Sequence, residues 1–482
     1  MPLVMGVDSS TQSTKVEVRD ADTGALVATG RAPHPSTTPP RSEQDPSAWW
    51  TALLSAIGQT GQKEIAAISV AGQQHGMVVT DEAGSVLRPA KLWNDTESAP
   101  EAAQLVKQFG AERWASSVGV VPVAAITVTK LAWLSRHERE VFDRIGRVML
   151  PHDWLTFRLT GRTVTDRGDA SGTGYWSPTQ GQWRPDILRR LDPAVGEGGW
   201  LERLPTVLGP AERADWLTAP VHELVGLRGR PIVAAGTGDN MAAALGIGLR
   251  PREVCMSLGT SGTVFTVSER PAADPSGAVA GFADATGRFL PLVCTNNATK
   301  VTRMVSRLLR VDEQGLGQLA LAEPAGAGGI TLLPYLDGER TPDRPHATGE
   351  IRGLRSDATR EQLARAAFEG VACSLLDGLD ALAAAGIRLA DGAIRLVGGG
   401  ARSAAYRQVL ADLAQRPVQV GEGEGEEHVA KGACVQATAA LREVSPDDVI
   451  EAWSLSGGGR TIEPDDVDAD AVREAYAAVR DA

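Results

Sequence analysis

The sequence predicts an α/β protein built from two related domains, on three observations. Its 482 residues are too many for one compact core and suit two or three domains. Apolar runs that read as buried strands lead through glycine-rich turns into helices. A strand followed by a small, hydroxyl-rich turn occurs at residues 5–11 and again at 256–264. The repeat predicts a similar start to each half, with both turns facing a shared cleft.

The overall charge excludes some classes of partner. The formal net charge is −12, with 22% charged and 43% hydrophobic residues. Non-specific binding to nucleic acids or to anionic membranes needs a basic face, so we expect neither partner. An anionic small molecule is not excluded, because one site can be positive within an acidic protein.

The cysteines and the apolar runs predict a cytoplasmic protein. Cys255, Cys294, Cys373 and Cys434 are far apart and form no CxxC pair, so we expect reduced thiols rather than disulfides or a zinc site. We see no signal peptide and no apolar stretch of about 18 residues that would span a membrane.

The first element is an antiparallel meander. Residues 3–8 predict a strand that ends at Asp8, the chain returns through Val16 and Val18, and residues 25–31 form a third strand. The turn between Asp8 and Lys15 is rich in Ser and Thr, whose hydroxyls, together with backbone N–H groups, can bind an anion. A plain polar hairpin is the alternative, and the turn alone favours it.

The next segments alternate loops, helices and strands. Residues 32–46 predict an exposed loop, and Asp45-Pro46 predicts the start of a helix. A strand over 65–70 runs into AGQQHG, where Gln74 and His75 suit hydrogen bonding to a polyol. A structural histidine is an equally good interpretation of His75.

An aromatic side chain stands beside polar groups in the following segment. Trp93 lies next to Asn94 and Asp95, a combination that often lines sugar pockets. Residues 97–160 predict mostly helices, with a short strand over 148–150. Residues 163–174 are polar and glycine-rich and predict a loop beside a pocket.

Asp239 lies in GTGDNMAAALG, where a predicted strand ends and a helix begins. A carboxylate there can serve as a general base or help to hold a metal. An ordinary helix cap is the alternative, and this stretch alone favours it. The helix dipole favours a negative charge at this position, so we expect Asp239 to stay ionised.

The second half contains two more glycine-bearing turns. LGTSG follows the strand that starts at Met256, and GGGARS lies between a strand over 394–397 and a helix over 404–414. Three glycines there permit close backbone approach to a flat or charged ligand. The turn lacks the dinucleotide fingerprint, and no P-loop motif occurs. Helices are expected over 360–384, 426–441 and 467–480, and an acidic loop over 421–427.

These motifs together resemble the FGGY family of carbohydrate kinases, in the right order over essentially the whole chain. The matching stretches are GVD (6–8), GDN (238–240), LGTSG (258–262) and GGGARS (398–403). The resemblance implies an α/β fold of two ribonuclease-H-like (actin-like ATPase) domains, 1–243 and 244–482, with a catalytic cleft between them. It also implies ATP as phosphoryl donor and Mg²⁺.

Within the family, the chain is most similar to members that phosphorylate D-xylulose to D-xylulose 5-phosphate. The similarity lies in SEQDPSAWW (42–50), AGQQHG (71–76), RPAKLWND (88–95) and LPYLDGERTP (333–342). Gln74 departs from this pattern, because bacterial members commonly have Met there. Its added hydrogen-bonding group opens the alternative of another ketose, a polyol or a sugar acid.

The resemblance, together with the residues themselves, predicts a set of functional side chains. Asp239 is the expected base for the sugar hydroxyl, and Asp8 and Asp239 are expected to place the metal. Expected sugar-binding residues are Gln74, His75, Trp93, Asp239 and Asn240. Expected ATP-binding residues are Thr11, Gln12, Lys15, Gly259, Thr260, Ser261, Gly399, Gly400 and Ala401.

Two other classes of function stay open on the sequence. One is an actin-like ATPase that acts as a conformational switch, although no appended partner-binding module is evident. The other is a sugar sensor without catalysis, which the presence of both Asp8 and Asp239 argues against. The expected partners are a sugar and ATP, and a homodimer is compatible with the sequence.

Overall fold

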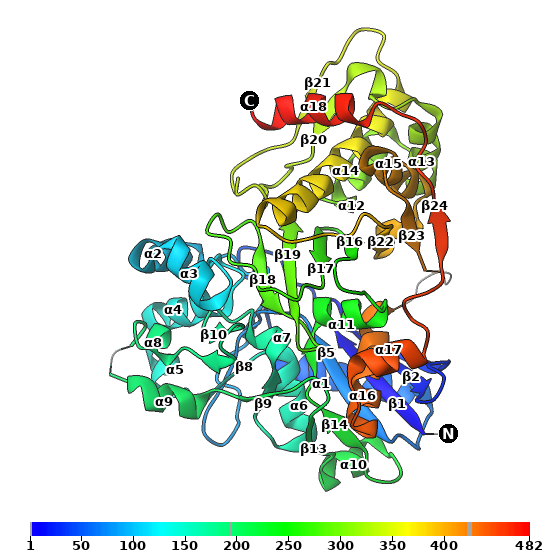
Figure 1. The fold of residues 1–482 in the computed structure, drawn as a ribbon. Coiled ribbons are helices and arrows are strands. Elements are labelled where there is room, and N and C mark those ends of the chain that lie inside the picture. Colours follow the sequence, from blue (N-terminus) through cyan, green and yellow to red (C-terminus); the bar gives the residue numbers. More distant parts are fainter. Residues whose placement is uncertain (1, 193, 422–426) are drawn as a thin grey trace. The chain divides into compact units, whose positions relative to one another are not determined.

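The computed structural model describes residues 2–192, 194–421 and 427–482. The chain divides into two compact units. Unit 1 takes Met1–Leu249, Glu269–Leu290 and Glu427–Ser456, and unit 2 takes Arg250–Ser268, Pro291–Glu426 and Gly457–Ala482. Most of the acidic loop expected over 421–427 lies outside the described residues. The chain thus returns to unit 1 near its end, as the colours of Figure 1 show.

Unit 1 is built on a mixed sheet with the strand order β13-β14-β5-β1-β2-β3, and β15 also pairs with β5. Strands β1 to β3 form the predicted antiparallel meander, and β5 and β14 continue it in parallel. The strands are β1 Leu3–Ser9, β2 Ser13–Asp20, β3 Leu26–Pro33, β5 Ala67–Gly72, β13 Arg213–Trp216, β14 Ile232–Ala234 and β15 Thr237–Gly238.

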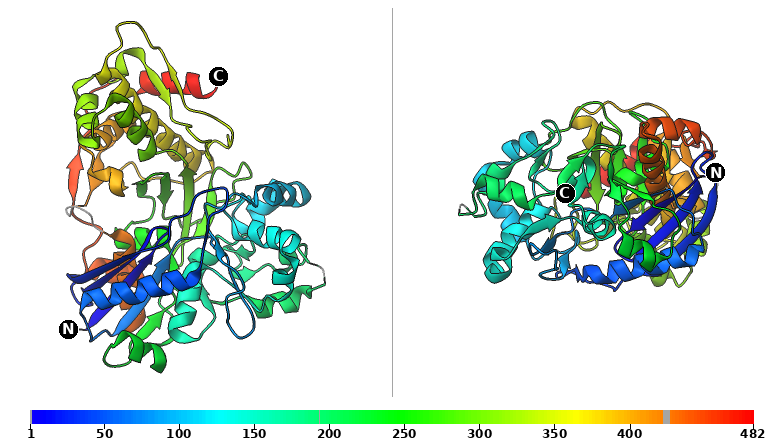
Figure 2. Two further views of the ribbon diagram at one scale, coloured as in Figure 1. Left: turned by 180° about the vertical axis from the view of Figure 1, so that it is seen from behind. Right: turned by 90° about the horizontal axis from the view of Figure 1, so that it is seen from below.

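One face of this sheet is covered by α1 (Pro46–Thr60) and α6 (Pro151–Thr160). As expected, α1 begins after Asp45, whose side chain accepts a hydrogen bond from the Ser47 backbone N–H. Its Trp49 meets Trp154 of α6 edge to face, with ring centroids 6.3 Å apart. Figure 2 shows α1 lying across the strands of the meander. Large side chains therefore fill this layer of the core.

The opposite face is covered by α11 (Asp239–Gly246) and α16 (His428–Arg442), which pack through small residues. A Cβ on Gly432 would lie 1.8 Å from the Ala242 carbonyl oxygen, and a Cβ on Gly246 1.9 Å from the His428 carbonyl oxygen. Only glycine allows the two backbones to approach this closely. The contact fixes the helix that starts at Asp239 against the sheet.

Residues 97–160 are mostly helical, as the sequence predicts. The helices in and beyond this range gather at one side of unit 1 (Figure 1). They are α2 Ala99–Phe109, α3 Ala111–Val118, α4 Thr127–His137, α5 Arg139–Asp143, α8 Pro185–Leu188 and α9 Gly196–Arg203. Unit 1 also contains short two-stranded pairs. They are β4 Glu43–Gln44 with β7 Ala90–Lys91, β6 Val78–Thr80 with β8 Arg147–Met149, β9 Val164–Asp166 with β12 Thr206–Leu208, and β10 Trp176–Ser177 with β11 Gln182–Trp183.

One predicted loop is wrong, and a second, over 32–46, is an exposed loop only in its middle. Residues 163–174 contain β9 and the helical turn α7 (Arg167–Ala170), and nearly all of them are buried. Asp166 creates this order, because its carboxylate accepts hydrogen bonds from the backbone N–H groups of Gly168 and Asp169. In the segment 32–46, Gln44 is buried within β4 and donates to the Thr11 carbonyl oxygen. Polar side chains that form hydrogen bonds to the backbone inside the fold give these segments the composition of a loop.

Unit 2 repeats the strand arrangement of unit 1. Its sheet runs β19-β17-β16-β22-β23-β24, with β19, β17 and β16 antiparallel and β22 and β23 added in parallel. The strands are β16 Val254–Leu258, β17 Gly262–Thr266, β19 Phe289–Thr295, β22 Ile394–Val397, β23 Val418–Val420 and β24 Arg460–Ile462. The similar construction of the two halves predicted from the sequence is therefore confirmed.

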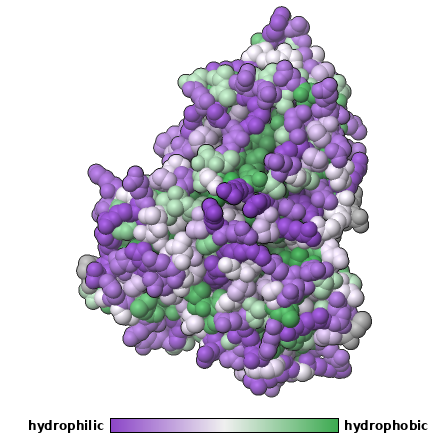
Figure 3. All heavy atoms as spheres, viewed as in Figure 1, coloured by the Kyte–Doolittle hydropathy of each residue, from purple (hydrophilic) through white to green (hydrophobic). Residues whose placement is uncertain are grey.

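Helices and a further strand pair complete unit 2. They are α12 Thr299–Leu309, α13 Glu313–Ala322, α14 Arg360–Ala384, α15 Ala404–Ala414 and α18 Ala469–Arg480, with β20 Thr331–Leu333 paired to β21 Glu350–Arg352. The predicted helices over 360–384 and 404–414 match α14 and α15. On the face shown in Figure 3, hydrophilic side chains cover most of the surface of each unit. Cys255, Cys373 and Cys434 are buried thiols.

Candidate active site

Three parallel strands of unit 1 end at the same edge of the sheet. β1 and β15 both lie in parallel to β5, with Asp8 opposite Ala71 and Gly238 opposite Gly72. The residues that follow these strand ends therefore meet at one place, which is where open α/β sheets bind ligands. Asp8, the Gln73-Gln74 pair and Asp239 reach this edge from three distant parts of the sequence.

Asp8 is a buried acid with one unsatisfied oxygen. The side chain of Lys15 lies 3.3 Å from Asp8 Oδ2 and also donates a 2.6 Å hydrogen bond to Glu427. Burial raises the pKa of Asp8 to about 6, against the opposing effect of Lys15. Asp8 Oδ1 is buried and has no hydrogen bond among the described residues. A buried carboxylate oxygen without a donor suits a cation as its partner.

Asp239 is the first residue of α11. Its Oδ1 accepts hydrogen bonds from the backbone N–H of Asn240 at 2.8 Å and from Asn240 Nδ2 at 2.9 Å. Both bonds fall on one oxygen, so within the described chain Oδ2 is the atom left to accept a proton. Asp239 does not cap α11, which has no side-chain cap. Its carboxylate is instead held in place by Asn240.

The surroundings of Asp239 oppose its negative charge. Burial raises its pKa to about 7, and the neighbouring carboxylates of Asp8 and Asp169 add to the rise. The helix dipole therefore does not decide the charge of Asp239 by itself. A dipole contributes about 0.3–1 kcal/mol at a helix end, which burial beside two acids exceeds. A cation at this edge would reverse that balance.

The AGQQHG turn supplies amides and a ring to the same edge. Gln74 is 4% exposed, and its Oε1 accepts a 2.8 Å hydrogen bond from Asn240 Nδ2. His75 has a φ of 64°, and its ring packs against Phe282, with centroids 5.4 Å apart. No pattern in the sequence indicates Phe282 at this place, because it comes from a distant strand, β18 (Ala280–Ala283).

Trp93 lies beside the first hydroxyl-rich turn. Its indole N–H donates to Thr11 Oγ1 at 3.0 Å, and Thr11 Oγ1 in turn donates to Gln73 Oε1 at 3.0 Å. Gln12, the next residue of the turn, is exposed. The contact joins a residue predicted to bind sugar to one predicted to bind phosphate.

In unit 2, the two glycine-bearing turns lie next to each other. Gly259, Thr260 and Ser261 connect β16 to β17, and the 3₁₀ turn η2 (Gly399–Arg402) follows β22. Because β16 and β22 are parallel neighbours, both turns lie at the same edge of their sheet. A Cβ on Gly400 would lie 2.8 Å from the Leu258 Cβ, which shows how closely the turns approach. Thr260 and Gly399 are exposed, so ligands can reach both turns.

A buried cluster of charged side chains under the unit 1 edge was not predicted from the sequence. His152 Nδ1 lies 2.8 Å from Asp169 Oδ2, and its Nε2 lies 3.1 Å from Asp153 Oδ1. Burial alone would lower the pKa of His152, but these acids and Asp166 raise it to about 9. The sequence contains one indication of the cluster, because Asp153, Asp166 and Asp169 lie in segments that also supply apolar core residues. The prediction of a loop over 163–174 led us to miss it.

Glu43, Asp95 and Glu97 form another acidic group, with carboxylate oxygens within 4.8 Å of one another. The buried Lys91 ammonium pairs with all three, at 3.1, 3.2 and 2.6 Å, and lies 4.0 Å from the Trp133 ring centroid. Lysine already occupies the position that a cation would take. The group is therefore an internal ion-pair network.

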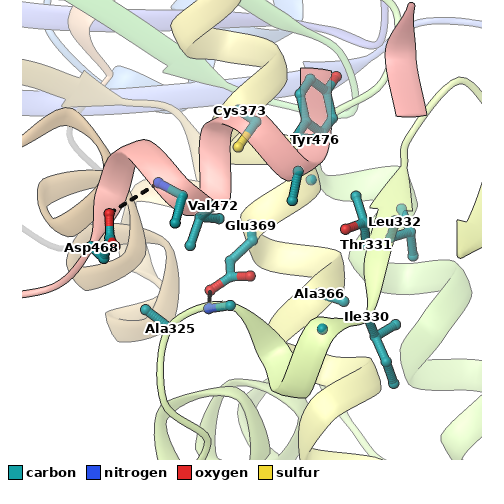
Figure 4. Close-up of a pocket in the computed structure, with 15 residues that line it drawn as sticks. Ala325, Ile330, Thr331, Leu332, Ala366, Glu369, Cys373, Asp468, Val472 and Tyr476 are labelled. Carbon is teal, nitrogen blue, oxygen red and sulfur yellow. Dashed lines mark hydrogen bonds between the residues drawn. The ribbon is translucent and has the colours of Figure 1, made fainter. Parts of the chain in front are cut away.

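Unit 2 also contains a cavity of about 260 Å³ (Figure 4). It lies between α14, β20 and the C-terminal helix α18, and its lining is mostly small and apolar. Glu369, the main charged side chain in it, already accepts hydrogen bonds from Arg365 and from the Gly326 backbone. The cavity holds none of the predicted site residues.

Among the described residues, no helix is both long and apolar enough to cross a membrane.

Comparison with known proteins shows which family the chain matches. The N-terminal domain of the FGGY family of carbohydrate kinases matches residues 3–246, and its C-terminal domain matches residues 254–441. The xylulose kinase of Streptomyces coelicolor is 48% identical over 95% of this chain and 92% of its own. The xylulose kinase of Escherichia coli is 35% identical over 87% of each chain.

Solved structures agree. The crystal structure of a xylulose kinase from Bifidobacterium adolescentis superimposes with a TM-score of 0.86 at 41% identity and covers 99% of both chains. The glycerol kinase of Plasmodium falciparum shares the fold, with a TM-score of 0.87 at 18% identity over 100% of this chain and 98% of its own. The predicted two-domain actin-like fold is thereby confirmed. The chain belongs to the FGGY family of carbohydrate kinases.

Proposed function

We propose that this protein transfers the γ-phosphoryl group of ATP to D-xylulose and releases D-xylulose 5-phosphate. The observation that carries the proposal is the meeting of Asp8, Gln74 and Asp239 at the ends of three parallel strands. Family membership supplies the reaction class, and relatives up to 48% identical that are named xylulose kinases supply the sugar.

Asp239 is the proposed base. With Oδ1 occupied by two N–H groups of Asn240, Oδ2 can accept the proton of the attacking sugar hydroxyl. Phosphoryl transfer needs mainly alignment and charge neutralisation, so a fixed carboxylate is more useful than a strong base. The orientation given by Asn240 therefore matters as much as the basicity of Asp239.

Asp8 and Asp239 are the proposed metal ligands. Within the described residues, the buried Oδ1 of Asp8 has no hydrogen bond, and the charge of Asp8 adds to the rise in the pKa of Asp239; both observations fit a divalent cation at this edge. Bound Mg²⁺ would neutralise charge on the phosphates of ATP. Lys15 holds Asp8 from the other side and, with Thr11 and Gln12, forms the proposed first phosphate turn.

The remaining ATP contacts are proposed for unit 2. The hydroxyls and backbone N–H groups of Gly259, Thr260 and Ser261 suit phosphate oxygens. The close approach allowed at Gly399, Gly400 and Ala401 suits a flat adenine. The proposal assigns sugar binding, the first phosphate turn and the base to residues 1–243 and nucleotide binding to residues 244–482. A cytoplasmic location and a homodimer complete it, and light scattering after size-exclusion chromatography tests the dimer.

Gln74, His75, Trp93 and Asn240 are the proposed sugar contacts besides Asp239. Gln74 provides the specific reason to consider a second sugar. Its Oε1 is bound to Asn240, while its NH₂ group carries two hydrogens, of which the contact with Asp169 uses at most one. A donor at this position favours a substrate with an additional acceptor, such as another ketose or a sugar acid.

Purified protein with ATP and Mg²⁺ should be offered a panel of ketoses, polyols and sugar acids, with ATP consumption as the readout. A maximum on D-xylulose is the expected result. A maximum on another sugar would keep the kinase but replace the substrate. ATP binding without turnover on any sugar would overturn the proposal and favour the switch or the sensor.

A further inference from the structure

The buried charged cluster of unit 1 lies directly behind the strand ends that carry the proposed site. His152, Asp153, Asp166 and Asp169 are each at most 2% exposed. Burying this many ionisable groups is costly unless each is paired. Asp153 caps the start of α6, and Asp166 caps α7 and also accepts from Thr237 Oγ1. These bonds give two of the acids structural roles, but they leave Asp169 unexplained.

His152 packs closely against two strand ends. A Cβ on Gly236 would lie 2.5 Å from Cδ2 of the imidazole ring, and a Cβ on Gly72 would lie 3.0 Å from the His152 Cβ. Gly72 ends β5, and Gly236 directly precedes β15. Glycine is needed at Gly236 because the ring takes the volume of a side chain there, while the backbone of His152 packs on Gly72. His152 is thus fixed between the segments that lead to Gln74 and to Asp239.

Asp169 lies between His152 and the AGQQHG turn. One oxygen, Oδ2, is bound to His152 Nδ1 at 2.8 Å. Burial raises the pKa of Asp169, while His152 and a contact from the Gln74 side chain oppose the rise. Gln74 Nε2 and Asp169 Oδ1 are both buried, and neither has a hydrogen bond to any other group among the described residues. The NH₂ group of Gln74 therefore faces this carboxylate.

The carbonyl oxygen of the Gln74 amide is bound to Asn240. Gln74 Oε1 accepts from Asn240 Nδ2, and the same Nδ2 donates to Asp239 Oδ1. An amide that turned over would place its NH₂ group against the NH₂ group of Asn240, and this bond would be lost. A negative oxygen on the far side of Gln74 prevents that rotation, because it attracts the NH₂ group and repels the carbonyl.

We propose that Asp169, anchored by His152, is a positioning residue for the transfer reaction. It fixes the orientation of the Gln74 amide so that Gln74 and Asn240 keep Asp239 Oδ1 occupied and leave Oδ2 for the sugar hydroxyl. This inference rests on the proposed function of Asp239 as the base. It assigns a role to a side chain that touches neither sugar nor nucleotide.

The variant Asp169→Asn tests the role, and Asp153→Asn is its matched control. Both acids are buried and both contact the His152 ring, but Gln74 faces Asp169. Because a misplaced reacting group costs up to about 10²-fold in rate, we expect Asp169→Asn to lower kcat by about 10- to 100-fold. The KM for ATP should stay unchanged. Asp153→Asn should lower the melting temperature but keep kcat near the wild-type value.

A double-mutant cycle with Gln74→Met separates positioning from general destabilisation. If Asp169 acts through Gln74, Asp169→Asn will lower kcat in the wild-type background and not in the Gln74→Met background. An equal loss in both backgrounds overturns the proposal. His152→Asn, which withdraws the anchor of Asp169, should show the same dependence on Gln74 and serves if Asp169→Asn does not fold.

A crystal structure of the Asp169→Asn protein gives a readout that needs no turnover. A rotated Gln74 amide, with its bond to Asn240 lost, supports the proposal. A Gln74–Asn240 bond still at 2.8 Å overturns it, whatever sugar the enzyme uses. Failure of the proposed function appears separately, as a wild-type protein that phosphorylates none of the sugars.

Discussion

The two units share one sheet order but differ in the turn that leaves the first strand. In unit 1 the turn after β1 contains the buried Asp8 and its partner Lys15. In unit 2 the corresponding turn, Gly259 to Ser261, contains small, uncharged residues and is partly exposed. The ionisable groups of the proposed site are thus concentrated in one copy. A duplicated fold can keep its backbone while one copy specialises in chemistry and the other in binding.

Removal of the proposed base in unit 1 should have the largest effect on the reaction rate. Asp239→Ala should lower kcat by about 10²–10⁴-fold, the usual contribution of a general base, while circular dichroism stays unchanged. ATP consumption with D-xylulose is the measurement. Glu64→Ala, which alters an exposed acid of the same unit, is the control and should retain activity. Near-normal turnover in Asp239→Ala would remove unit 1 as the seat of the chemistry.

The contrast between the two turns can be sharpened at Asp8. Asp8→Asn removes the charge without changing the shape, so kcat should fall by about 10²-fold, the size seen when one charge-stabilising group is lost. The Mg²⁺ concentration for half-maximal rate should rise, because one proposed ligand becomes neutral. Titration of the rate with Mg²⁺ tests this, and an unchanged midpoint would separate Asp8 from the metal.

The matching change in unit 2 should affect binding only. Thr260→Ala removes one hydroxyl from the second turn, and one hydrogen bond contributes about 0.5–1.5 kcal/mol. The KM for ATP should therefore rise by about 2- to 10-fold with kcat nearly constant. Initial rates at varied ATP measure it. A fall in kcat without a change in KM would contradict the division of roles.

Two neighbouring glycines of unit 2 test its packing rather than its chemistry, and the smallest change of all is expected at Gly399. A Cβ on Gly399 meets little within 4 Å, whereas one on Gly400 would lie 2.8 Å from the Leu258 Cβ. Gly400→Ala should lower the free energy of unfolding by about 1–3 kcal/mol through overpacking. Gly399→Ala should change it by less than about 0.5 kcal/mol. Urea unfolding measures both, and equal losses would contradict the packing described.

The sequence predicted the elements that depend on local pattern. The meander of β1 to β3, the start of α1 at Asp45 and the strand-to-helix junction at Asp239 all follow from alternation, capping or glycine placement. The meeting of Asp8, Gln74 and Asp239 follows from parallel strands ending together, although the pairing of β5 with both β1 and β15 came only from the structure. Their roles in catalysis stay predictions.

Long-range packing explains the features that the sequence did not reveal. His152 and Asp169 are 17 residues apart in the sequence. They meet because α6 and α7 both pack against β9. Their polarity is typical of a loop in any local window, so the buried pairing leaves no periodic signal. Phe282 reaches His75 from more than two hundred residues away for the same reason.

The close packing of Gly246 on Gly432 has a consequence for synthesis on the ribosome. The face of the first sheet that α16 covers is made mostly in the first third of the chain, yet α16 ends only at Arg442 of 482 residues. Until then, Ala71 and Ala242 lack the helix that buries them. Unit 1 therefore cannot finish folding before most of unit 2 has emerged, and its exposed apolar face must be kept from other nascent chains during that time.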